Sequence, residues 1–326
     1  MGFGADAAAN SPSFDCGAAG AAGTETCCGL ANIDSYLHRW KEAVDQPAAG
    51  VAALLAKRGI VKLVVLGDSL AAQWATAFTF MMARDGVPCH CGPRFEDTAP
   101  GTRARLPWLQ DGHRWLICGK LCLLSWLPCG HTWLNKTGDI LRELTGDFSG
   151  AVDAISFNAG PHFGEEWIAG TLAYALPLLQ RFAEKPGKLG MFRETAAQHF
   201  PGSTTGSHEG RIPDQTGGCS RGPAIPGARQ RALTDLVPSR FNAIVVETLF
   251  AATRDRGDMH MGKNGDGALD CSHFCFNPLF WQGIFSNLHA VLGRWAAADH
   301  GKRDVKPGGA ATSPIVDATP FSTRTT

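Results

Sequence analysis

Apolar runs that alternate with helical patterns predict an α/β fold for the middle of the chain. Residues 61–66 are all valine or leucine except for Lys62, which is typical of a strand buried on both faces of a parallel sheet. This run ends at Gly67. From 70 to 84 large apolar residues recur at spacings of three and four, which predicts a helix with one buried face. The pattern is therefore a strand, a tight turn and a helix.

The same alternation continues along the chain. Further strands are predicted at 151–158, 188–193 and 242–250, and further helices at 167–184, around 229–236 and at 281–298. Two short apolar runs, 114–118 and 121–126, are joined by Gly119 and Lys120 and predict a hairpin at the edge of the sheet. We therefore expect an α/β three-layer sandwich with a parallel central sheet and an edge hairpin.

The composition places this fold in one domain. The 326 residues are 44% hydrophobic and 18% charged, which excludes a disordered or fibrous protein. Residues 1–29 are rich in Ala and Gly, and residues 301–326 are rich in Pro, Gly, Ser and Thr. Both ends are expected to be tails, the second one disordered. Residues 30–300 are then expected to form a single domain that carries the site.

The charge and hydropathy of the chain exclude some partners. Thirty basic residues balance thirty acidic ones, so no net field attracts nucleic acid or an anionic membrane, and we expect no nucleic-acid partner. No stretch reaches about 18 consecutive apolar residues, so no transmembrane segment is expected in this chain. The first thirty residues also lack the basic head and apolar run of an export signal.

Eleven cysteines raise the question of metal binding or disulfides, and their odd number leaves at least one unpaired if the others form disulfides. One alternative is a zinc site, because thiolate and imidazole are the usual ligands of zinc. The residues that would build it with the late cysteines are Cys89, His90, Cys91, Cys129 and His131. Paired Cys-x-x-Cys motifs are missing from the sequence, so we expect no metal.

The turn after the first predicted strand contains Gly67, Asp68 and Ser69. In open parallel sheets reactive groups lie beyond the carboxyl ends of the strands, where helices begin. A serine at such a turn projects its hydroxyl clear of the sheet, and its own N–H can stabilise the oxyanion that forms when it attacks an ester. The simpler alternative is that Asp68 or Ser69 only caps the helix.

A serine nucleophile needs a base, and a late segment of the chain supplies one. Asp270 and His273 lie three residues apart, just before the last predicted helix. One short loop could bring His273 to Ser69 while Asp270 orients the imidazole ring. The alternative is an exposed turn that caps the final helix. Taken together, the two motifs favour nucleophilic catalysis.

These motifs resemble a known family. Val65-Leu66-Gly67-Asp68-Ser69-Leu70 is similar to the first block of the SGNH (GDSL) hydrolase superfamily. Asp270-Cys271-Ser272-His273-Phe274-Cys275 closely resembles the Asp-Cys-Ser-His-aromatic-Cys block of the PC-esterase group, which includes the plant trichome-birefringence-like polysaccharide O-acetyltransferases. Shorter similar segments lie between them, at 157–162, 192–195, 199–200, 217–219 and 256–260. The chain departs from the plant pattern at Pro161 and at Ala196-Ala197.

The resemblance implies a role for each matching residue. Ser69 would be the nucleophile, His273 the general base and acid, and Asp270 its orienting partner. The oxyanion would be stabilised by Ser69 and by the amide of Asn158, whose alternative role is that of a turn residue at a strand end. Cys271 and Cys275 flank the proposed base, so a disulfide from either one to another loop would brace His273, and Cys219 is a candidate partner. Substrate-binding roles are expected for the remaining matches, which are Asp68, Gly160, His162, Arg193, His199, Arg256 and His260.

The resemblance further implies an SGNH-hydrolase-like, flavodoxin-like fold and an O-acetyltransferase that moves an acetyl group to a glycan hydroxyl through an acyl-enzyme on Ser69. A carbohydrate acetyl esterase with the same triad is one alternative, and an inactive, lectin-like glycan-binding module is another. No cofactor is expected to be bound, and the acetyl donor would be a molecule such as acetyl-CoA or an acetylated carrier. The partner would be a carbohydrate or polysaccharide acceptor, and the location the Golgi lumen or another part of the secretory pathway.

Overall fold

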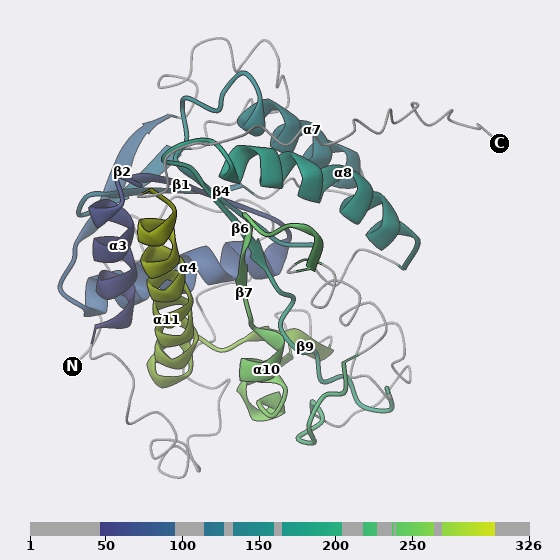
Figure 1. Ribbon diagram of the computed structural model, residues 1–326. Coiled ribbons are helices and arrows are strands. Elements are labelled where there is room, and N and C mark those ends of the chain that lie inside the picture. The colour runs from purple at the N-terminus through teal and green to yellow at the C-terminus, as the bar shows by residue number, and fades with distance from the viewer. Residues whose placement is uncertain are drawn as a thin grey trace.

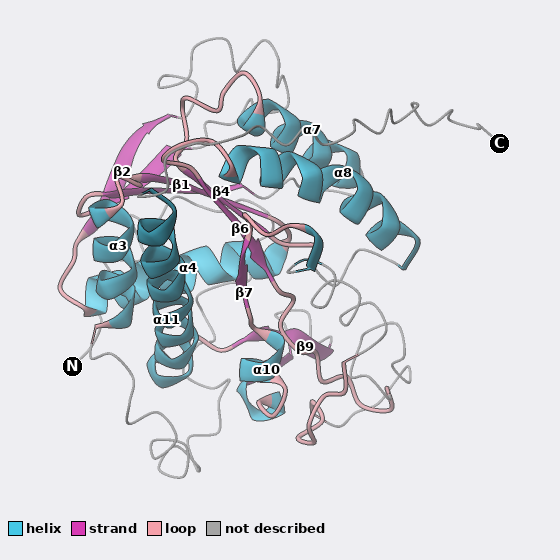
Figure 2. Cartoon of the chain, in the orientation of Figure 1, coloured by secondary structure: helices cyan, strands magenta, loops and turns pink. Residues whose placement is uncertain are grey.

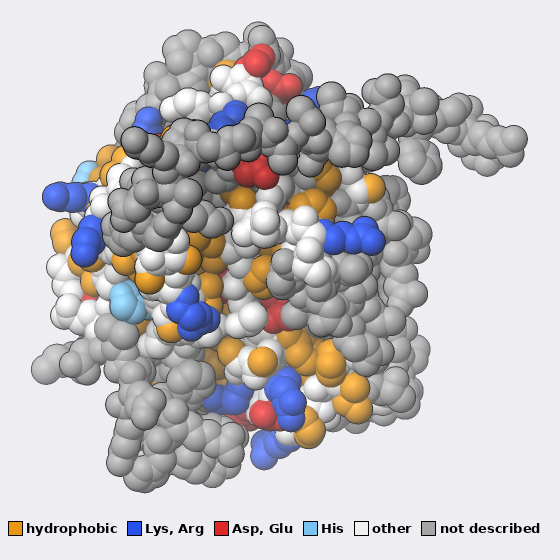
Figure 3. Space-filling view, viewed as in Figure 1, with side chains coloured by type: hydrophobic (Ala, Val, Ile, Leu, Met, Phe, Trp, Pro, Cys, Tyr) orange, Lys and Arg blue, Asp and Glu red, His pale blue; other side chains and the backbone are white. Residues whose placement is uncertain are grey.

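The computed structural model describes residues 46–94, 114–126, 133–159, 165–203, 218–226, 237, 239–263 and 269–303. The N-terminal tail at 1–29, the helix expected around 229–236 and residues 304–326 lie outside this set. No helix among the described residues has the length and apolar character needed to cross a bilayer. On the face seen in Figure 3, several Lys and Arg side chains lie near one another at the lower edge, beside an Asp or Glu side chain, and others are spread over the rest of the face.

The centre of the molecule is a seven-stranded sheet in which parallel pairing dominates. Its strands, in spatial order, are β2 (Cys89–Arg94), β3 (Arg114–Cys118), β4 (Leu121–Trp126), β1 (Lys62–Leu66), β5 (Ala154–Phe157), β6 (Leu189–Arg193) and β7 (Val245–Glu247). The last five run parallel, from β4 through β1 to β7. Counted along the chain, they lie in the order 2-1-3-4-5, which is the flavodoxin-like arrangement. The order reverses between β1 and β5, and ligand sites of such sheets lie at this point.

Helices cover both faces of the sheet, so the predicted α/β three-layer architecture is confirmed (Figures 1 and 2). One face packs against α3 (Pro47–Lys57), α4 (Ser69–Arg84) and α11 (Pro278–Arg303), and the other against α7 (Trp133–Thr145) and α8 (Glu165–Ala183). Strand β1 lies between the two layers. Its side chains alternate, with Leu63 and Val65 in the first apolar core and Val64 and Leu66 in the second. This explains why its sequence is apolar almost throughout.

The expected hairpin forms, but it is not at the edge of the sheet. Strands β3 and β4 are antiparallel and joined at 119–120 as predicted, yet β4 also pairs with β1 and β3 pairs with β2. Strand β2 is therefore the edge, and the Cys89–Cys118 disulfide joins it to β3. The sequence of β2, which is CHCGPR, has neither an apolar run nor alternation, so the pattern of hydrophobic residues did not reveal it.

A second, two-stranded sheet lies outside the central one. It consists of β8 (His260–Lys263) and β9 (Leu269–Phe274) and follows the short helices α10 (Phe250–Thr253) and η6 (Gly257–Met259). Figure 1 shows β9 beside α10, away from the seven-stranded sheet. The strand predicted at 242–250 is correspondingly shorter, because α10 begins at its end. The last helix reaches Arg303, so residues 301–303, which were predicted to belong to the tail, are helical; the alanines at 296–298 favour continuation of the helix.

Candidate active site

The turn between β1 and α4 presents Ser69 at the carboxyl edge of the sheet. Gly67 follows the strand at a crowded position: a Cβ there would lie 2.9 Å from Ala71 Cβ and 3.2 Å from Asn158 Cβ. Asp68 caps the helix, because its Oδ1 accepts a hydrogen bond of 3.0 Å from the N–H of Leu70. Ser69 is the first residue of α4, so its own N–H has no acceptor within the helix. The capping alternative is thus fulfilled by Asp68 and leaves the Ser69 hydroxyl available for chemistry.

Ser69 meets the two residues of the late motif. Its Oγ lies 2.7 Å from Nε2 of His273, although the two residues are 204 positions apart in the chain. On the other side of the ring, Nδ1 of His273 lies 2.8 Å from Oδ2 of Asp270. The His273 and Asp270 side chains are 26% and 16% exposed, so the arrangement is neither a free surface turn nor sealed from solvent. The geometry is that of a Ser-His-Asp triad.

An irregular strand brings both late side chains to the same side. Strand β9 pairs with β8 at Phe274 opposite His260 and at Asp270 opposite Gly262, with a register shift between these pairs. Residues 271–273 therefore face one residue of β8, and such bulges re-aim side chains next to active sites. Oδ1 of Asp270 fixes the turn by accepting hydrogen bonds of 3.0 Å from the N–H groups of Ser272 and His273.

Asp270 and His273 each shift the pKa of the other so that the charged forms of both are favoured. Burial alone would raise the pKa of Asp270, but the hydrogen bonds and charge of His273, together with the N–H of Ser272, lower this pKa to about 2. Burial alone would lower the pKa of His273, but the hydrogen bond and negative charge of Asp270, with a contribution from Asp68, raise it above its ordinary value. The structure therefore makes His273 a stronger base than a free histidine while Asp270 stays ionised.

A disulfide braces the strand that carries the base. Cys219 is bonded to Cys271, one of the two pairings expected from the cysteines that flank His273, and Cys275 is disulfide-bonded as well. Cys271 lies between Asp270 and His273 and is fully buried. The bond thus ties the irregular part of β9 to the segment around 219.

We expect the Cys219–Cys271 bond to stabilise the folded protein substantially. The bond closes a loop of 52 residues, for which the chain-entropy model gives a loss of about 4 kcal/mol in the free energy of unfolding when the bond is absent. Denaturant unfolding of a Cys219→Ser/Cys271→Ser variant measures this loss. Cys122→Ser is the control, because Cys122 is a free thiol in β4. A loss of less than about 1 kcal/mol would contradict the bracing role.

Asn158 follows β5 next to the nucleophile turn, but its amide is engaged by protein. Its Nδ2 donates to the carbonyl oxygen of Arg193 at 2.8 Å and to Oγ1 of Thr195 at 3.4 Å. The donor expected for an oxyanion is therefore used to join the ends of β5 and β6. The other group expected to stabilise the oxyanion is the N–H of Ser69, which makes no hydrogen bond within α4.

Arg193 is a buried structural residue, which corrects its expected role as a substrate contact. Its guanidinium is 1% exposed, lies over the ring of Trp74 at 5.3 Å and donates to Oγ of Ser156 at 3.1 Å. Trp74 in turn donates to Glu247 at 3.0 Å. Burial raises the pKa of Glu247 to about 7, although the positive charge of Arg193 and the Trp74 bond act in the opposite direction. In the sequence, Trp74 belongs to the apolar spacing of residues 70–84 and Arg193 to a segment similar to the PC-esterase group, whereas no pattern indicated Glu247.

His199 and His260 are likewise inside the protein rather than in a substrate groove. They are 1% and 3% exposed, and Nδ1 of His199 lies 2.7 Å from Nε2 of His260. Each ring also lies against a backbone carbonyl oxygen, with 2.8 Å between His199 Nε2 and the oxygen of Arg254 and 3.0 Å between His260 Nδ1 and the oxygen of His273. Burial lowers the pKa of both rings, that of His260 to about 3. These histidines are therefore buried, and His260 lies against the backbone of β9 at His273.

Four expected substrate contacts remain, and the two that the structure describes are buried. Arg256 is 5% exposed, pairs with Asp258 at 3.1 Å and lies over the ring of Phe280 at 5.7 Å, so its expected substrate contact is corrected to a packing role. Asp68 is buried as well and acts as the helix cap described above. Gly160 and His162 lie outside the described residues.

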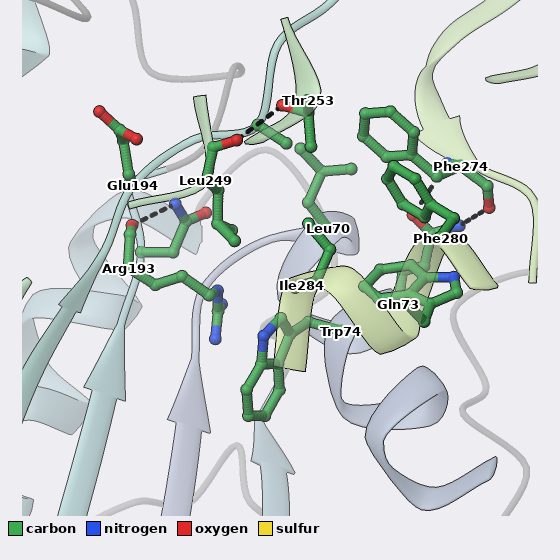
Figure 4. Close-up of a pocket in the computed structure, with 13 residues that line it drawn as sticks. Leu70, Gln73, Trp74, Arg193, Glu194, Leu249, Thr253, Phe274, Phe280 and Ile284 are labelled. Carbon is green, nitrogen blue, oxygen red and sulfur yellow. Dashed lines mark hydrogen bonds between the residues drawn. The ribbon is translucent and has the colours of Figure 1, made fainter. Parts of the chain in front are cut away.

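A small cavity is lined by the residues that follow Ser69 and His273 in the chain, which are Leu70 and Phe274. Gln73, Trp74 and Arg193 are also among its walls (Figure 4). Its volume of ≈ 20 Å³ has room for about one water molecule. A sugar ring does not fit there, so a glycan would have to reach Ser69 from the solvent side.

The zinc alternative loses one of its ligands, since Cys89 is bonded to Cys118. Within the part of the chain that the structure describes, no group of three or more His, Cys, Asp or Glu side chains is arranged to hold a metal ion. Cys129 and His131 lie outside that part.

Comparison of the chain with known proteins gives no match. No protein-family model matches the chain, and no curated protein and no solved structure matches it either. The case for a function therefore rests on the triad and on the motifs in the sequence.

Proposed function

We propose that this protein is a serine acyltransferase of the SGNH type, in which Ser69 forms an acyl-enzyme with His273 as base and Asp270 as its partner. The observation that carries the proposal is the continuous chain of contacts from Ser69 Oγ through the imidazole to Asp270, at 2.7 and 2.8 Å. A hydroxyl, an imidazole and an ionised carboxylate in this order form the arrangement that activates serine in unrelated folds.

The chemistry follows from these positions. Nε2 of His273 takes the proton of Ser69 while Oγ bonds to the acyl carbon of the donor, and the N–H of Ser69 is the group closest at hand for the resulting oxyanion. When the intermediate collapses, His273 gives its proton to the departing group of the donor. An acceptor hydroxyl then loses its proton to His273 and attacks the acyl-enzyme, and His273 gives this proton to Oγ of Ser69 as the acyl–serine bond breaks, which restores both residues.

The acyl group and the acceptor are proposed from the resemblance to the PC-esterase group. On this proposal Ser69 carries an acetyl group from a donor such as acetyl-CoA or an acetylated carrier, and the acceptor is a glycan hydroxyl. The partial exposure of His273, at 26%, leaves an approach for a bulky acceptor from solvent. The disulfides are typical of proteins that fold in an oxidising compartment and support the proposal that the protein works in the Golgi lumen or elsewhere in the secretory pathway.

The same exposure favours a second candidate, a carbohydrate acetyl esterase. Water can reach an acyl-enzyme that is open to solvent, and it would then replace the sugar as acceptor. The residues and the first half of the reaction are unchanged. The two functions differ only in the product of the second half.

One experiment tests both the common step and the difference. The protein is treated with a fluorophosphonate probe, and we expect mass spectrometry to find the adduct on Ser69. It is then incubated with an isotope-labelled acetyl donor, with and without oligosaccharides, and the label is measured in free acetate and in glycan. Label in the glycan supports the transferase, and acetate alone supports the esterase. No adduct on a folded sample would exclude both and would favour a glycan-binding module.

A further inference from the structure

The base of the triad is not placed by the central sheet. Ser69 begins α4, directly after the central strand β1, whereas His273 belongs to β9, which pairs only with β8 in the separate two-stranded sheet. The alignment of Ser69 with His273 therefore depends on contacts that cross from α4 to β9. A contact that holds the backbone of β9 would control this alignment.

Gln73 makes such a contact. It lies four residues after Ser69 on α4, so the two side chains are on the same face of the helix. Its Nε2 donates to the carbonyl oxygen of Phe274 at 2.6 Å, and its Oε1 accepts from the N–H of the same residue at 3.0 Å. Gln73 and Phe274 are both buried, at 8% and 2% exposed. Figure 4 shows both hydrogen bonds, with Gln73 facing the strand.

We propose that Gln73 is a positioning residue, which fixes the backbone directly after His273 to the helix of the nucleophile and so aligns the imidazole with Ser69. The inference rests on the proposed function, since it assigns a role within the same triad. An amide suits this role because it offers one donor and one acceptor side by side, which is what the N–H and C=O of one strand residue require. His260 lies against the carbonyl group of His273 from the other side, at 3.0 Å.

Removing the two hydrogen bonds should slow the formation of the acyl-enzyme. In Gln73→Met the side chain keeps its approximate length and volume but leaves the N–H and C=O of Phe274 buried without these partners. The strand then shifts to recover partners, and a displacement of about 1 Å at a reacting group costs about a hundredfold in rate. We expect Gln73→Met to be labelled by a fluorophosphonate about a hundredfold more slowly than the wild type.

Gln73→Glu provides a readout that packing alone does not give. A protonated carboxyl group offers the same donor and acceptor as the amide, whereas an ionised carboxylate has no donor for the carbonyl oxygen of Phe274. We expect the labelling rate of Gln73→Glu, divided by that of the wild type, to fall at least about tenfold as the pH rises through the titration of the new carboxyl group. The same ratio for Gln73→Met should not change with pH.

Titration of other charged groups near Gln73 does not make this ratio of labelling rates fall with pH. Arg193 and Glu194 line the same cavity as Gln73, and Asp270 and His273 lie on β9. Since these groups are present in every protein compared, division by the wild-type rate removes their own titration. A negative charge that acted only by raising the pKa of His273 would make the ratio rise with pH, because the base would be protonated to a higher pH.

The experiment measures labelling rates from pH 5 to 9 for the wild type, Gln73→Met, Gln73→Glu and Gln180→Met. Gln180 is a matched control, because it also bonds a backbone N–H of another segment, that of Ala243 at 3.1 Å, but lies on α8 across the sheet. Thermal unfolding confirms that each variant is folded. Slow labelling of Gln73→Met together with a falling ratio for Gln73→Glu supports the proposal. Labelling of Gln73→Met at the rate of the wild type or of Gln180→Met, or a flat or rising ratio, overturns it. Failure of the wild type to label at Ser69 would instead remove the proposed function.

Discussion

His273→Ala is expected to lower turnover by about 10⁵ to 10⁶-fold, and Ser69→Ala by a similar factor, because loss of either one disables a triad that acts as a unit. Ser69 Oγ has its contact of 2.7 Å with His273 and no other base within the triad. The double variant should therefore be no slower than either single variant. Rates of acetate release or glycan acetylation, measured for all three proteins, test this non-additivity.

The matched control for these variants is Ser149→Ala. Ser149 lies in the turn before β5, at the end of the sheet opposite to Ser69, and should leave turnover and probe labelling unchanged. Thermal unfolding should give midpoints for Ser69→Ala and His273→Ala close to that of the wild type, since both side chains are partly exposed. A large loss of stability with normal residual turnover would show that the contact serves the fold and not a reaction.

Asp270→Asn is expected to lower turnover by about 10⁴-fold, as loss of the orienting carboxylate does in other triads. Oδ1 of Asp270 accepts two backbone N–H groups, so the amide oxygen of asparagine must take that place. The amide N–H₂ then faces Nδ1 of His273, which can only accept and must lose its hydrogen. The imidazole proton moves to Nε2, where it faces Ser69 and blocks removal of the serine proton.

The same variant should change the pH dependence of the reaction. Acyl-enzyme formation needs neutral His273, and Asp270 raises the pKa of that ring. Wild-type activity should therefore rise with pH and reach half its maximum above about 6.5, the ordinary pKa of histidine. In Asp270→Asn the midpoint should move to lower pH, because the negative charge that favours the protonated ring is absent. A midpoint that stays in place would contradict the assigned pair.

Several elements could be predicted from the sequence because their signal is local. Strand β1 and helix α4 lie within one residue of the predicted bounds, since a continuous apolar run and a spacing of three and four are read directly from neighbouring residues. The hairpin of β3 and β4 was predicted with its bounds for the same reason. Its place inside the sheet was not, because strand neighbours are chosen by pairing with β1 and β2, which lie far away in the chain.

Some residues of the candidate site also have a local signal in the sequence, and others do not. The sequence by itself identified Ser69, Asp270 and His273, because a serine after a buried strand and an Asp-x-x-His motif are local patterns with a chemical meaning. It also suggested Cys219 as a disulfide partner for one of the two cysteines that flank His273. It did not identify Gln73, since a glutamine on a helix carries no mark of the strand that it binds.

The sequence therefore determined which residues are candidates for catalysis, the alternation of strands and helices, and the turn that holds Ser69. Only the tertiary structure decided that Ser69 and His273 touch across 204 residues, and that Arg193, His199 and His260 face inward instead of lining a groove. The physical reason is that side-chain burial and hydrogen-bond partners are set by which segments pack together. A residue's own neighbours in the chain fix its chemistry and its local conformation, but not what lies across from it.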